Sequence, residues 1–124
     1  MIRFAMLSLA VLATAAAGAA RPVKSTRIPA AFQGDWALEA RNCASGPVDS
    51  GNMRITARTI INFESKGKVE RVMILDSQTI RIESRVTHSN VTFGSLEMMS
   101  LSSDKKQLTI GEHSDISIYT RCAK

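Results

Sequence analysis

Apolar and polar residues alternate along most of the chain after residue 35, with a period of two. Residues 79–87 are the clearest case, with Ile80, Ile82 and Val86 on one side and Arg81, Glu83 and Arg85 on the other. Such alternation is typical of a β-strand that buries one face and exposes the other. We find no apolar repeat that would make an amphipathic helix longer than about two turns, so the pattern predicts an all-β fold.

Turn-forming residues divide the alternating pattern into eight expected strands. These strands cover residues 35–41, 53–58, 59–64, 69–75, 79–87, 91–101, 108–110 and 116–121. Turns at intervals of about 8–12 residues are typical of sandwiches and up-and-down barrels. Short sequential hairpins favour a meander, and closure removes the two exposed edges that an open meander would leave. We therefore expect a small eight-stranded antiparallel meander barrel, with a sandwich as the alternative.

Two local features refine the expected strands. Lys66-Gly67 predicts a tight hairpin before the strand at residues 69–75. In residues 91–101 the apolar residues change parity between Met98 and Met99. A β-bulge at this point or near Gly94 would account for the change.

Residues 1–20 have the organisation of a signal peptide. Met1-Ile2-Arg3 supplies a positive start, residues 4–17 are apolar except for two hydroxyl residues, and Ala17-Gly18-Ala19-Ala20 supplies small residues. We expect cleavage after Ala19 or Ala20. The apolar run of about 14 residues is shorter than the roughly 20 that cross a bilayer. The sequence therefore predicts a periplasmic or secreted protein with no membrane span after signal removal.

Residues 21–31 connect the expected signal peptide to the barrel domain, which we place at residues 32–124. Residues 21–26 are polar and basic without a period, which predicts a flexible N-terminal tail. Arg21, Lys24 and Arg27 are the cations of this segment. Residues 28–32 are compatible with one helical turn, with Pro29 at an early position where its missing N–H has no cost.

The chain has only two cysteines, Cys43 and Cys122. An even number of cysteines in a small exported domain predicts a disulfide, and two cysteines allow one intramolecular pairing. The bond would close a loop of about 80 residues and contribute roughly 4 kcal/mol to stability in the chain-entropy model. The wide spacing does not suit a reactive or metal-binding thiol pair.

The charge distribution excludes some classes of partner. The chain has 16 basic and 11 acidic residues, a formal net charge of +5, and loss of Arg3 with the signal peptide leaves +4. The charges are scattered, without the dense Lys/Arg stripes and interleaved aromatics that nucleic-acid binding requires. We expect no nucleic-acid partner and only a weak attraction to anionic surfaces.

The sequence contains no recognisable catalytic or metal-ligating pattern. Its two histidines, His88 and His113, both fall in expected turns. Glu112-His113-Ser114-Asp115 contains the residue types of a hydrolase triad, but consecutive residues cannot orient one another as a triad requires. We expect a protein that is not an enzyme and has no cofactor or bound metal.

Phe32-x-Gly34-x-Trp36 before a β-meander, with Arg121 on the last strand, resembles the structural signature of the calycin superfamily, which includes lipocalins, avidins and Inh-type metalloprotease inhibitors. In those proteins the tryptophan packs under a basic side chain from the last strand. The resemblance implies that Gly34, Trp36 and Arg121 close one end of the barrel. The whole chain after residue 20 is also similar to small exported proteins of Alphaproteobacteria with a Trp-x6-Cys start, a middle like residues 61–69 and an Arg-Cys end. That similarity implies no activity.

Three functional hypotheses follow. The first is a binding module, and by analogy with the Inh type it would inhibit an envelope hydrolase by inserting the tail that carries Arg21, Lys24 and Arg27. The second is a structural or interaction component of the envelope without a ligand. The third is a carrier of a small apolar ligand, which short strands disfavour because their own side chains should fill the barrel. We expect a monomer whose partner is an envelope or secreted protein.

Overall fold

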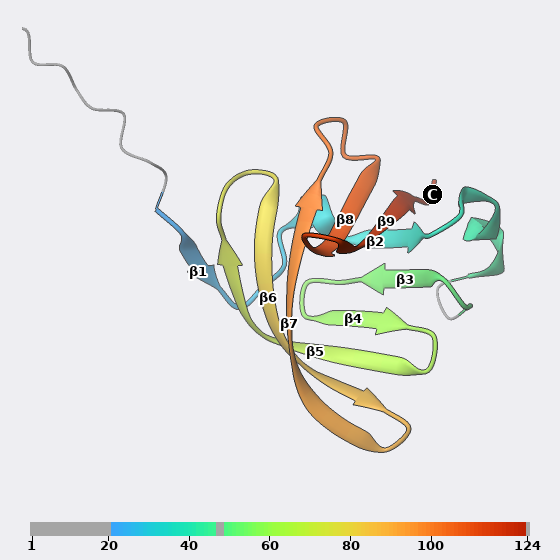
Figure 1. Cartoon of the computed structure of the whole chain (residues 1–124), viewed down its shortest axis with the longest axis horizontal. Helices are drawn as coiled ribbons and strands as arrows, with labels where there is room; N and C mark the ends of the chain where they lie inside the picture. Colours follow the sequence, from blue (N-terminus) through green and yellow to red (C-terminus); the bar gives the residue numbers. More distant parts are fainter. Residues whose placement is uncertain (1–20, 47–48, 124) are drawn as a thin grey trace, which may run out of the picture.

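Eight antiparallel strands form a closed barrel in the computed structural model, and a ninth strand pairs with the edge of one of them (Figure 1). The structure describes residues 21–46 and 49–123, so the expected signal peptide at residues 1–20 lies outside the described residues. The strands are β1 (Val23–Ser25), β2 (Gly34–Ala37), β3 (Asn52–Ile55), β4 (Thr59–Asn62), β5 (Ser65–Ile74), β6 (Thr79–His88), β7 (Val91–Leu101), β8 (Gln107–Glu112) and β9 (Asp115–Arg121). Two short 3-10 helices lie at Ala30–Phe32 and Ala40–Ser45.

The barrel is an uninterrupted meander from β2 to β9. Each of these strands pairs with its neighbours in sequence, and β2 pairs with β9 to close the barrel. The predicted all-β fold, the antiparallel meander barrel and the single disulfide are therefore confirmed, and the sandwich alternative is wrong. In the described part of the chain, no helix has the length and apolar character needed to cross a bilayer.

The inward side chains of the strands fill the barrel. On β6 the predicted alternation is confirmed, since Ile80 and Ile82 are buried whereas Arg81 and Glu83 are exposed. The buried apolar core consists of Ile28, Phe32, Trp36, Met53, Ile55, Ile60, Val72, Ile80, Ile82, Met99, Leu101 and Leu108. Core residues come from every barrel strand except β9, whose Tyr119 packs against the cluster from one side.

The bulge lies in β5 and not, as the sequence suggested, in β7. The register between β6 and β7 is continuous from Thr79↔Ser100 to His88↔Val91, whereas the register between β5 and β6 shifts between Val69 and Arg71. The extra residue keeps Val69 and Val72 on the inner side of β5. The change of parity in β7 has another cause, because Leu96 is an outward apolar residue, 62% exposed.

Two other local predictions are also wrong. The hairpin between β4 and β5 turns at residues 63–64, where Glu64 adopts a left-handed conformation (φ 61°), and Lys66-Gly67 continue into β5. The strand expected at residues 35–41 ends at Ala37. The chain then enters the 3-10 helix Ala40–Ser45, which positions Cys43 beside the end of β9.

The segment predicted to be a flexible tail contains a strand. β1 pairs antiparallel with β5, with Lys24 opposite Met73 and Ser25 opposite Val72. The edge of β5 is free at this point because β4 pairs only with Ser65–Lys68. Ile28 is 1% exposed and belongs to the core, so the folded unit includes residues before the expected boundary at 32.

Trp36 and Arg121 lie opposite each other where β2 meets β9. The Arg121 guanidinium carbon lies 4.2 Å from the centre of the fully buried Trp36 ring. The same guanidinium donates hydrogen bonds to the main-chain carbonyls of Ala31, Gln33 and Lys105. Gly34 has φ +131°, and a Cβ there would lie 3.1 Å from Nη1 of Arg121. The lack of a side chain at Gly34 therefore permits both the positive φ of its backbone and the close approach of the Arg121 guanidinium.

Cys43 and Cys122 form the expected disulfide, with their Cα atoms 5.5 Å apart. The bond links the 3-10 helix after β2 to the residue that follows β9. It therefore reinforces the same junction as Trp36 and Arg121.

The closure contact predicts non-additive mutational effects. Trp36→Ala should lower the free energy of unfolding by about 3–5 kcal/mol, because it removes a large buried aromatic side chain. Arg121→Ala should cost less. A double-mutant cycle measured by urea unfolding should give a coupling of about 0.5–2 kcal/mol. Strictly additive losses would show that the cation and the ring do not stabilise each other.

The disulfide predicts a redox-dependent stability. Both thiols should resist alkylation until a reductant is added, and reduction should lower the free energy of unfolding by about 4 kcal/mol because the 79-residue separation allows a much larger unfolded ensemble. Urea unfolding of the oxidised protein and of its reduced, alkylated form measures this difference. Equal unfolding midpoints for the two forms would contradict it.

Candidate functional site

The residues singled out in the sequence occupy two different regions. Gly34, Trp36 and Arg121 form the closed junction, where the arginine's hydrogen bonds go to main-chain carbonyls. Arg21, Lys24 and Arg27 are exposed, but Lys24 belongs to the strand Val23–Ser25, which is paired with β5. Tail insertion into a protease cleft would therefore require β1 to leave the sheet.

The interior of the barrel offers little room for a ligand. The hollow inside it has a volume of about 30 Å³ and is lined by Ile60, Asn62, Gly67, Ser84, Val86, Ser95 and Glu97. This volume is close to that of a single water molecule in the liquid. A small-molecule pocket needs roughly ten times more.

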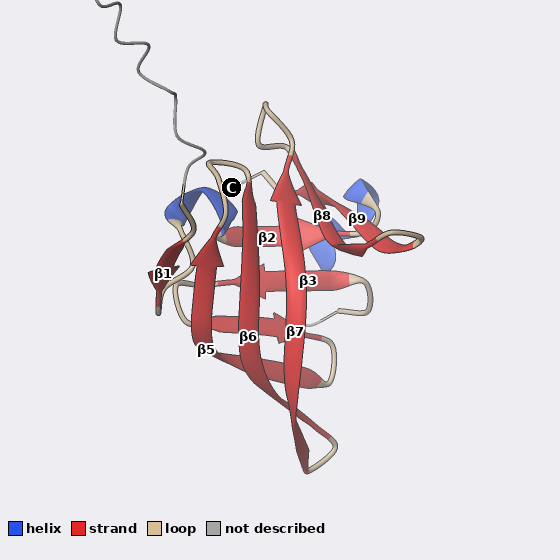
Figure 2. Ribbon diagram, turned by 60° about the vertical axis from the view of Figure 1, so that its left-hand side comes forward, coloured by secondary structure: helices blue, strands red, loops and turns tan. Residues whose placement is uncertain are grey.

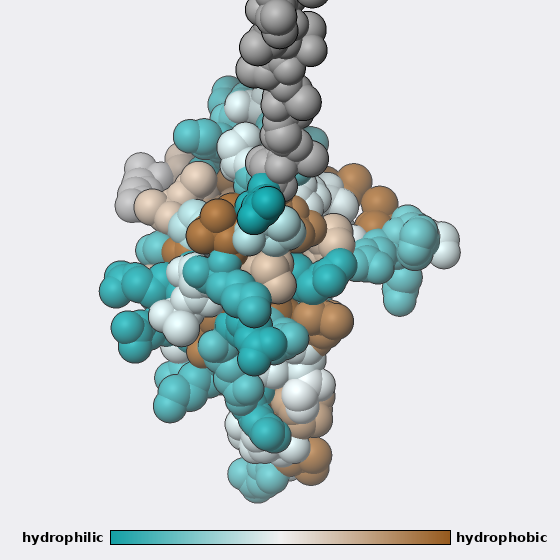
Figure 3. Space-filling model, turned by 90° about the vertical axis from the view of Figure 1, so that its left-hand side faces the viewer, coloured by the Kyte–Doolittle hydropathy of each residue, from teal (hydrophilic) through white to brown (hydrophobic). Residues whose placement is uncertain are grey.

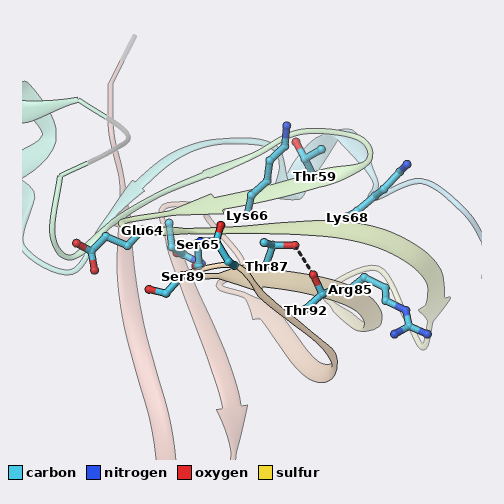
Figure 4. A pocket seen from close by; sticks show the side chains of 11 residues that line it. Thr59, Glu64, Ser65, Lys66, Lys68, Arg85, Thr87, Ser89 and Thr92 are labelled. Atoms are coloured by element: carbon cyan, nitrogen blue, oxygen red, sulfur yellow. Dashed lines mark hydrogen bonds between the residues drawn. The ribbon is translucent and has the colours of Figure 1, made fainter.

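A larger hollow lies around the hairpins β4–β5 and β6–β7, and we call it the cationic hollow. Its volume is about 900 Å³. Its lining combines three cations, one carboxylate and seven uncharged polar residues: Lys66, Lys68, Arg85, Glu64, Thr59, Asn62, Ser65, Thr87, Ser89, Asn90 and Thr92. Figure 4 shows the side chains of Lys66 and Lys68 on the same side of β5, with Thr59 between them.

The strand register brings these side chains together in two rows. In the first row Thr59 lies opposite Lys68, Lys68 lies opposite Arg85, and Arg85 lies opposite Gly94. In the second row Lys66 lies opposite Thr87, and Thr87 lies opposite Thr92. Four consecutive strands thus contribute to one surface. Two of the cations, Lys66 and Lys68, come from β5, and the third, Arg85, comes from β6.

The pairing of Lys68 with Arg85 is unfavourable for the sheet. Like charges directly opposite each other on adjacent strands repel, and Lys66 adds a third cation two residues along β5. Arg85 has a partial compensation, because its Nε lies 3.0 Å from the Glu70 carboxylate. Both members of that pair are more than half exposed, so it contributes little. Within the described residues, neither lysine forms an ion pair.

Hydroxyl groups lie beside the cations. The hydroxyl oxygens of Thr87 and Thr92 are 3.0 Å apart, and one donates to the other (Figure 4). The β6–β7 turn places Ser89 and Asn90 in left-handed conformations (φ 49° and 67°), as the type I′ hairpin turn requires. Ammonium, guanidinium and hydroxyl groups together are suitable donors for the oxygens of a phosphate, sulfate or carboxylate.

Gly94 leaves one end of the first row open. Its backbone does not adopt a positive φ, and a Cβ built on it would meet no atom within 4 Å. Neither the backbone conformation nor the packing therefore requires a glycine at residue 94. Because glycine weakens the interior of a strand, its presence here has a cost to stability. The absence of a side chain keeps the surface beside Arg85 accessible from β7.

The local sequence patterns do not reveal the cationic hollow. Alternation correctly placed Arg85 on the outer face, but the hairpin assigned to Lys66-Gly67 put the lysine in a turn. The detectable signal was the set of outward cations and threonines on residues 59, 66, 68, 85, 87 and 92. Those residues become neighbours only through the register of three strand pairs.

Other expected features of the surface can also be located. Glu112 and Asp115 end β8 and begin β9, and His113 lies in the turn between them. Among residues 21–46 and 49–123, no group of histidine, cysteine and acidic side chains could hold a metal ion. Figure 3 shows one face of the molecule, on which hydrophilic side chains predominate and hydrophobic ones are scattered between them.

Comparison of the chain with protein-family models, curated proteins and solved structures finds no match. The resemblance to calycins therefore stays a prediction from Gly34, Trp36 and Arg121.

Because Lys68 lies opposite Arg85, we expect that replacing one of these two cations with a neutral residue will stabilise the protein. Lys68→Gln should raise the free energy of unfolding by about 0.2–1 kcal/mol at low ionic strength, because it removes the repulsion from Arg85. Urea unfolding at low and high salt measures this effect, and the gain should shrink as salt screens the charges. Arg81→Gln is the matched control, since Arg81 lies between two methionines, Met73 and Met98. Equal effects of the two substitutions would contradict the proposed repulsion.

Proposed function

We propose that this chain is an exported, non-enzymatic binding module that holds an anionic partner in the cationic hollow. The observation that carries the proposal is the row in which Lys68 lies opposite Arg85, with Lys66 beside it. This arrangement disfavours the folded state when the site is empty and favours it when an anion bridges the cations.

The dimensions of the site favour a partner with several anionic groups. Adjacent strands lie about 4.8 Å apart, and residues two apart on one strand are separated by about 6.7 Å. Lys66, Lys68 and Arg85 thus form a triangle of cations on an exposed surface. A single phosphate on such a surface would compete with water and salt, whereas a chain of phosphate, sulfate or carboxylate groups would contact several cations at once.

Export of the module is supported by the signal-peptide pattern at residues 1–20 and by the disulfide, which is typical of oxidising compartments. In the periplasm or outside the cell, the partner would be an anionic envelope or secreted macromolecule. The alternatives are weaker. For a carrier, the hollow of about 30 Å³ between the inward side chains is too small to hold a ligand. An inhibitor acting through its N-terminus would first have to release β1.

A charge-matched pair of variants tests the proposal. We expect the wild-type chain to bind a heparin-derived oligosaccharide and a linear polyphosphate, measured by isothermal titration calorimetry at several salt concentrations. The triple variant Lys66→Gln, Lys68→Gln, Arg85→Gln should raise the Kd for either probe by about tenfold or more, equivalent to 1.4 kcal/mol. It should also reduce the dependence of the Kd on salt, because fewer counterions are released.

The control variant Arg41→Gln, Arg71→Gln, Arg81→Gln removes the same net charge from exposed residues outside the hollow. It should change the Kd much less. Gly94→Val adds no charge and should weaken binding by narrowing access beside Arg85 without loss of folding. Equal losses in the two triple variants would mean that only net charge matters. Absence of binding by the wild type would favour a structural component without a ligand.

A further inference from the structure

One edge of β7 has no partner strand over most of its length. β7 pairs with β6 from Val91 to Ser100, but with β8 only at Met99–Leu101. Over Val91–Met98, the described part of the chain supplies no strand to the other edge. Figure 2 shows that β8 and β9 turn away from the lower half of β7, whereas β6 stays beside it. Main-chain N–H and C=O groups along this edge are therefore available to another strand.

The ladder between β7 and β8 stops where charges would meet. Its last pair is Met99↔Ile110, and continuation in the same register would place Glu97 opposite Glu112. Asp115, which pairs with Glu112, adds a third carboxylate at this point. Like charges in adjacent strand positions repel. A cleft of about 470 Å³ separates residues 96–98 of β7 from the β8–β9 hairpin, so the edge remains open.

Apart from the inward-pointing charge of Glu97, the free edge lacks the features that usually block strand addition. Val91 and Leu96 are each 62% exposed, and Phe93 is 48% exposed. Residues 91–98 contain no lysine, arginine or proline, and Glu97 is their only charged residue. The pairing with β6 is regular throughout, so no bulge twists the edge away. A long, regular and partly apolar edge of this kind favours pairing with another strand.

We propose that the partner is a second copy of this chain, bound by antiparallel pairing of the two β7 edges about a two-fold axis. Charge is the argument for this occupant. The chain carries a net charge of +5, or +4 without residues 1–20, and cations line the neighbouring strands β5 and β6. The edge of β7 is therefore a place where two copies of a basic chain can approach without opposing cations.

The geometry of the pairing separates the carboxylates as well. A two-fold axis perpendicular to the sheet pairs residues of the same face, so the ladder is centred on one residue. Centred on Gly94, it places Glu97 opposite Val91 of the other copy. Centred on Ser95, it places Glu97 opposite Phe93. In both registers the two Glu97 side chains lie opposite apolar residues and not opposite each other.

Self-pairing would extend the cationic surface. With Gly94 at the centre, the row Thr59, Lys68, Arg85 and Gly94 continues into the same row of the second copy in reverse order. The two Arg85 residues would stand three strand spacings apart, about 14 Å. The glycine, which packing does not require, would then lie at the middle of one continuous surface. The dimer itself does not depend on the proposed binding of anions.

Two measurements on the purified chain test the dimer. Sedimentation velocity over a wide concentration range should show a reversible monomer–dimer equilibrium. Hydrogen–deuterium exchange should show amides of residues 91–98 becoming more protected as concentration rises. Leu96→Lys should raise the dimer Kd by about tenfold or more, because a charge on the edge opposes strand addition. Leu38→Lys is the matched control, since Leu38 is 46% exposed and lies outside the edge. It should leave the equilibrium unchanged.

Hydrogen–deuterium exchange of the wild-type chain tests the dimer even if the Leu96→Lys variant fails to fold. A chain that stays monomeric at the highest concentration, with unchanged exchange at residues 91–98, would overturn the proposal. A dimer that tolerates Leu96→Lys would also overturn it, because the contact would then lie elsewhere. Protection of β7 in a strictly monomeric sample would instead identify the chain's own β8–β9 hairpin as the occupant.

Discussion

The structure depends on the closure of β2 against β9, and side chains supply most of what holds that closure. The main-chain ladder between these strands covers only Trp36↔Arg121 and Ala37↔Thr120. Arg121 compensates for the short ladder by covering the Trp36 ring and by donating to three carbonyls from two segments that are far apart in the sequence. The residue after Arg121, Cys122, is then linked to Cys43 by the disulfide. Without these contacts the meander would be an open sheet, and its inward apolar residues would lose the enclosure that makes them a core.

The features of the fold that depend on side-chain patterns could be predicted from the sequence. The features that depend on main-chain pairing or on an unusual backbone conformation could not. The alternation on β6, the disulfide and the closed meander follow from side-chain patterns and from the cysteine count. β1 was missed because Val23–Ser25 joins the sheet by main-chain pairing, and all three residues are at least partly exposed. The β4–β5 hairpin was displaced because Glu64, and not a glycine, adopts the left-handed turn conformation. The cationic hollow depends on the register of four strands, which no local pattern encodes.

Because side chains fill the interior of the barrel, a binding site is more readily accommodated on its outer surface. The inner faces are occupied by the core, and the hollow between Ile60, Gly67 and Glu97 has a volume of only about 30 Å³. On the outer face, by contrast, Lys68 lies opposite the like-charged Arg85, and Gly94 occupies a position where a side chain would fit. At binding surfaces, residues that are not the most stabilising ones for the local structure are expected. Here they occur together on one face of adjacent strands, which is why we place the function there and not in the interior.

The position of the closing contacts has a kinetic consequence. Residues 34–43 meet residues 121–122, so the junction joins segments separated by most of the folded chain. The hairpins β5–β6 and β6–β7 involve only local contacts and are favoured to form early, whereas loop closure over such a separation is entropically slow. Because the chain is synthesised from its N-terminus, Cys122 becomes available 79 residues after Cys43. Oxidation of the correct pair can therefore follow only after β9 is available, and until then Cys43 remains a free thiol on an unclosed sheet.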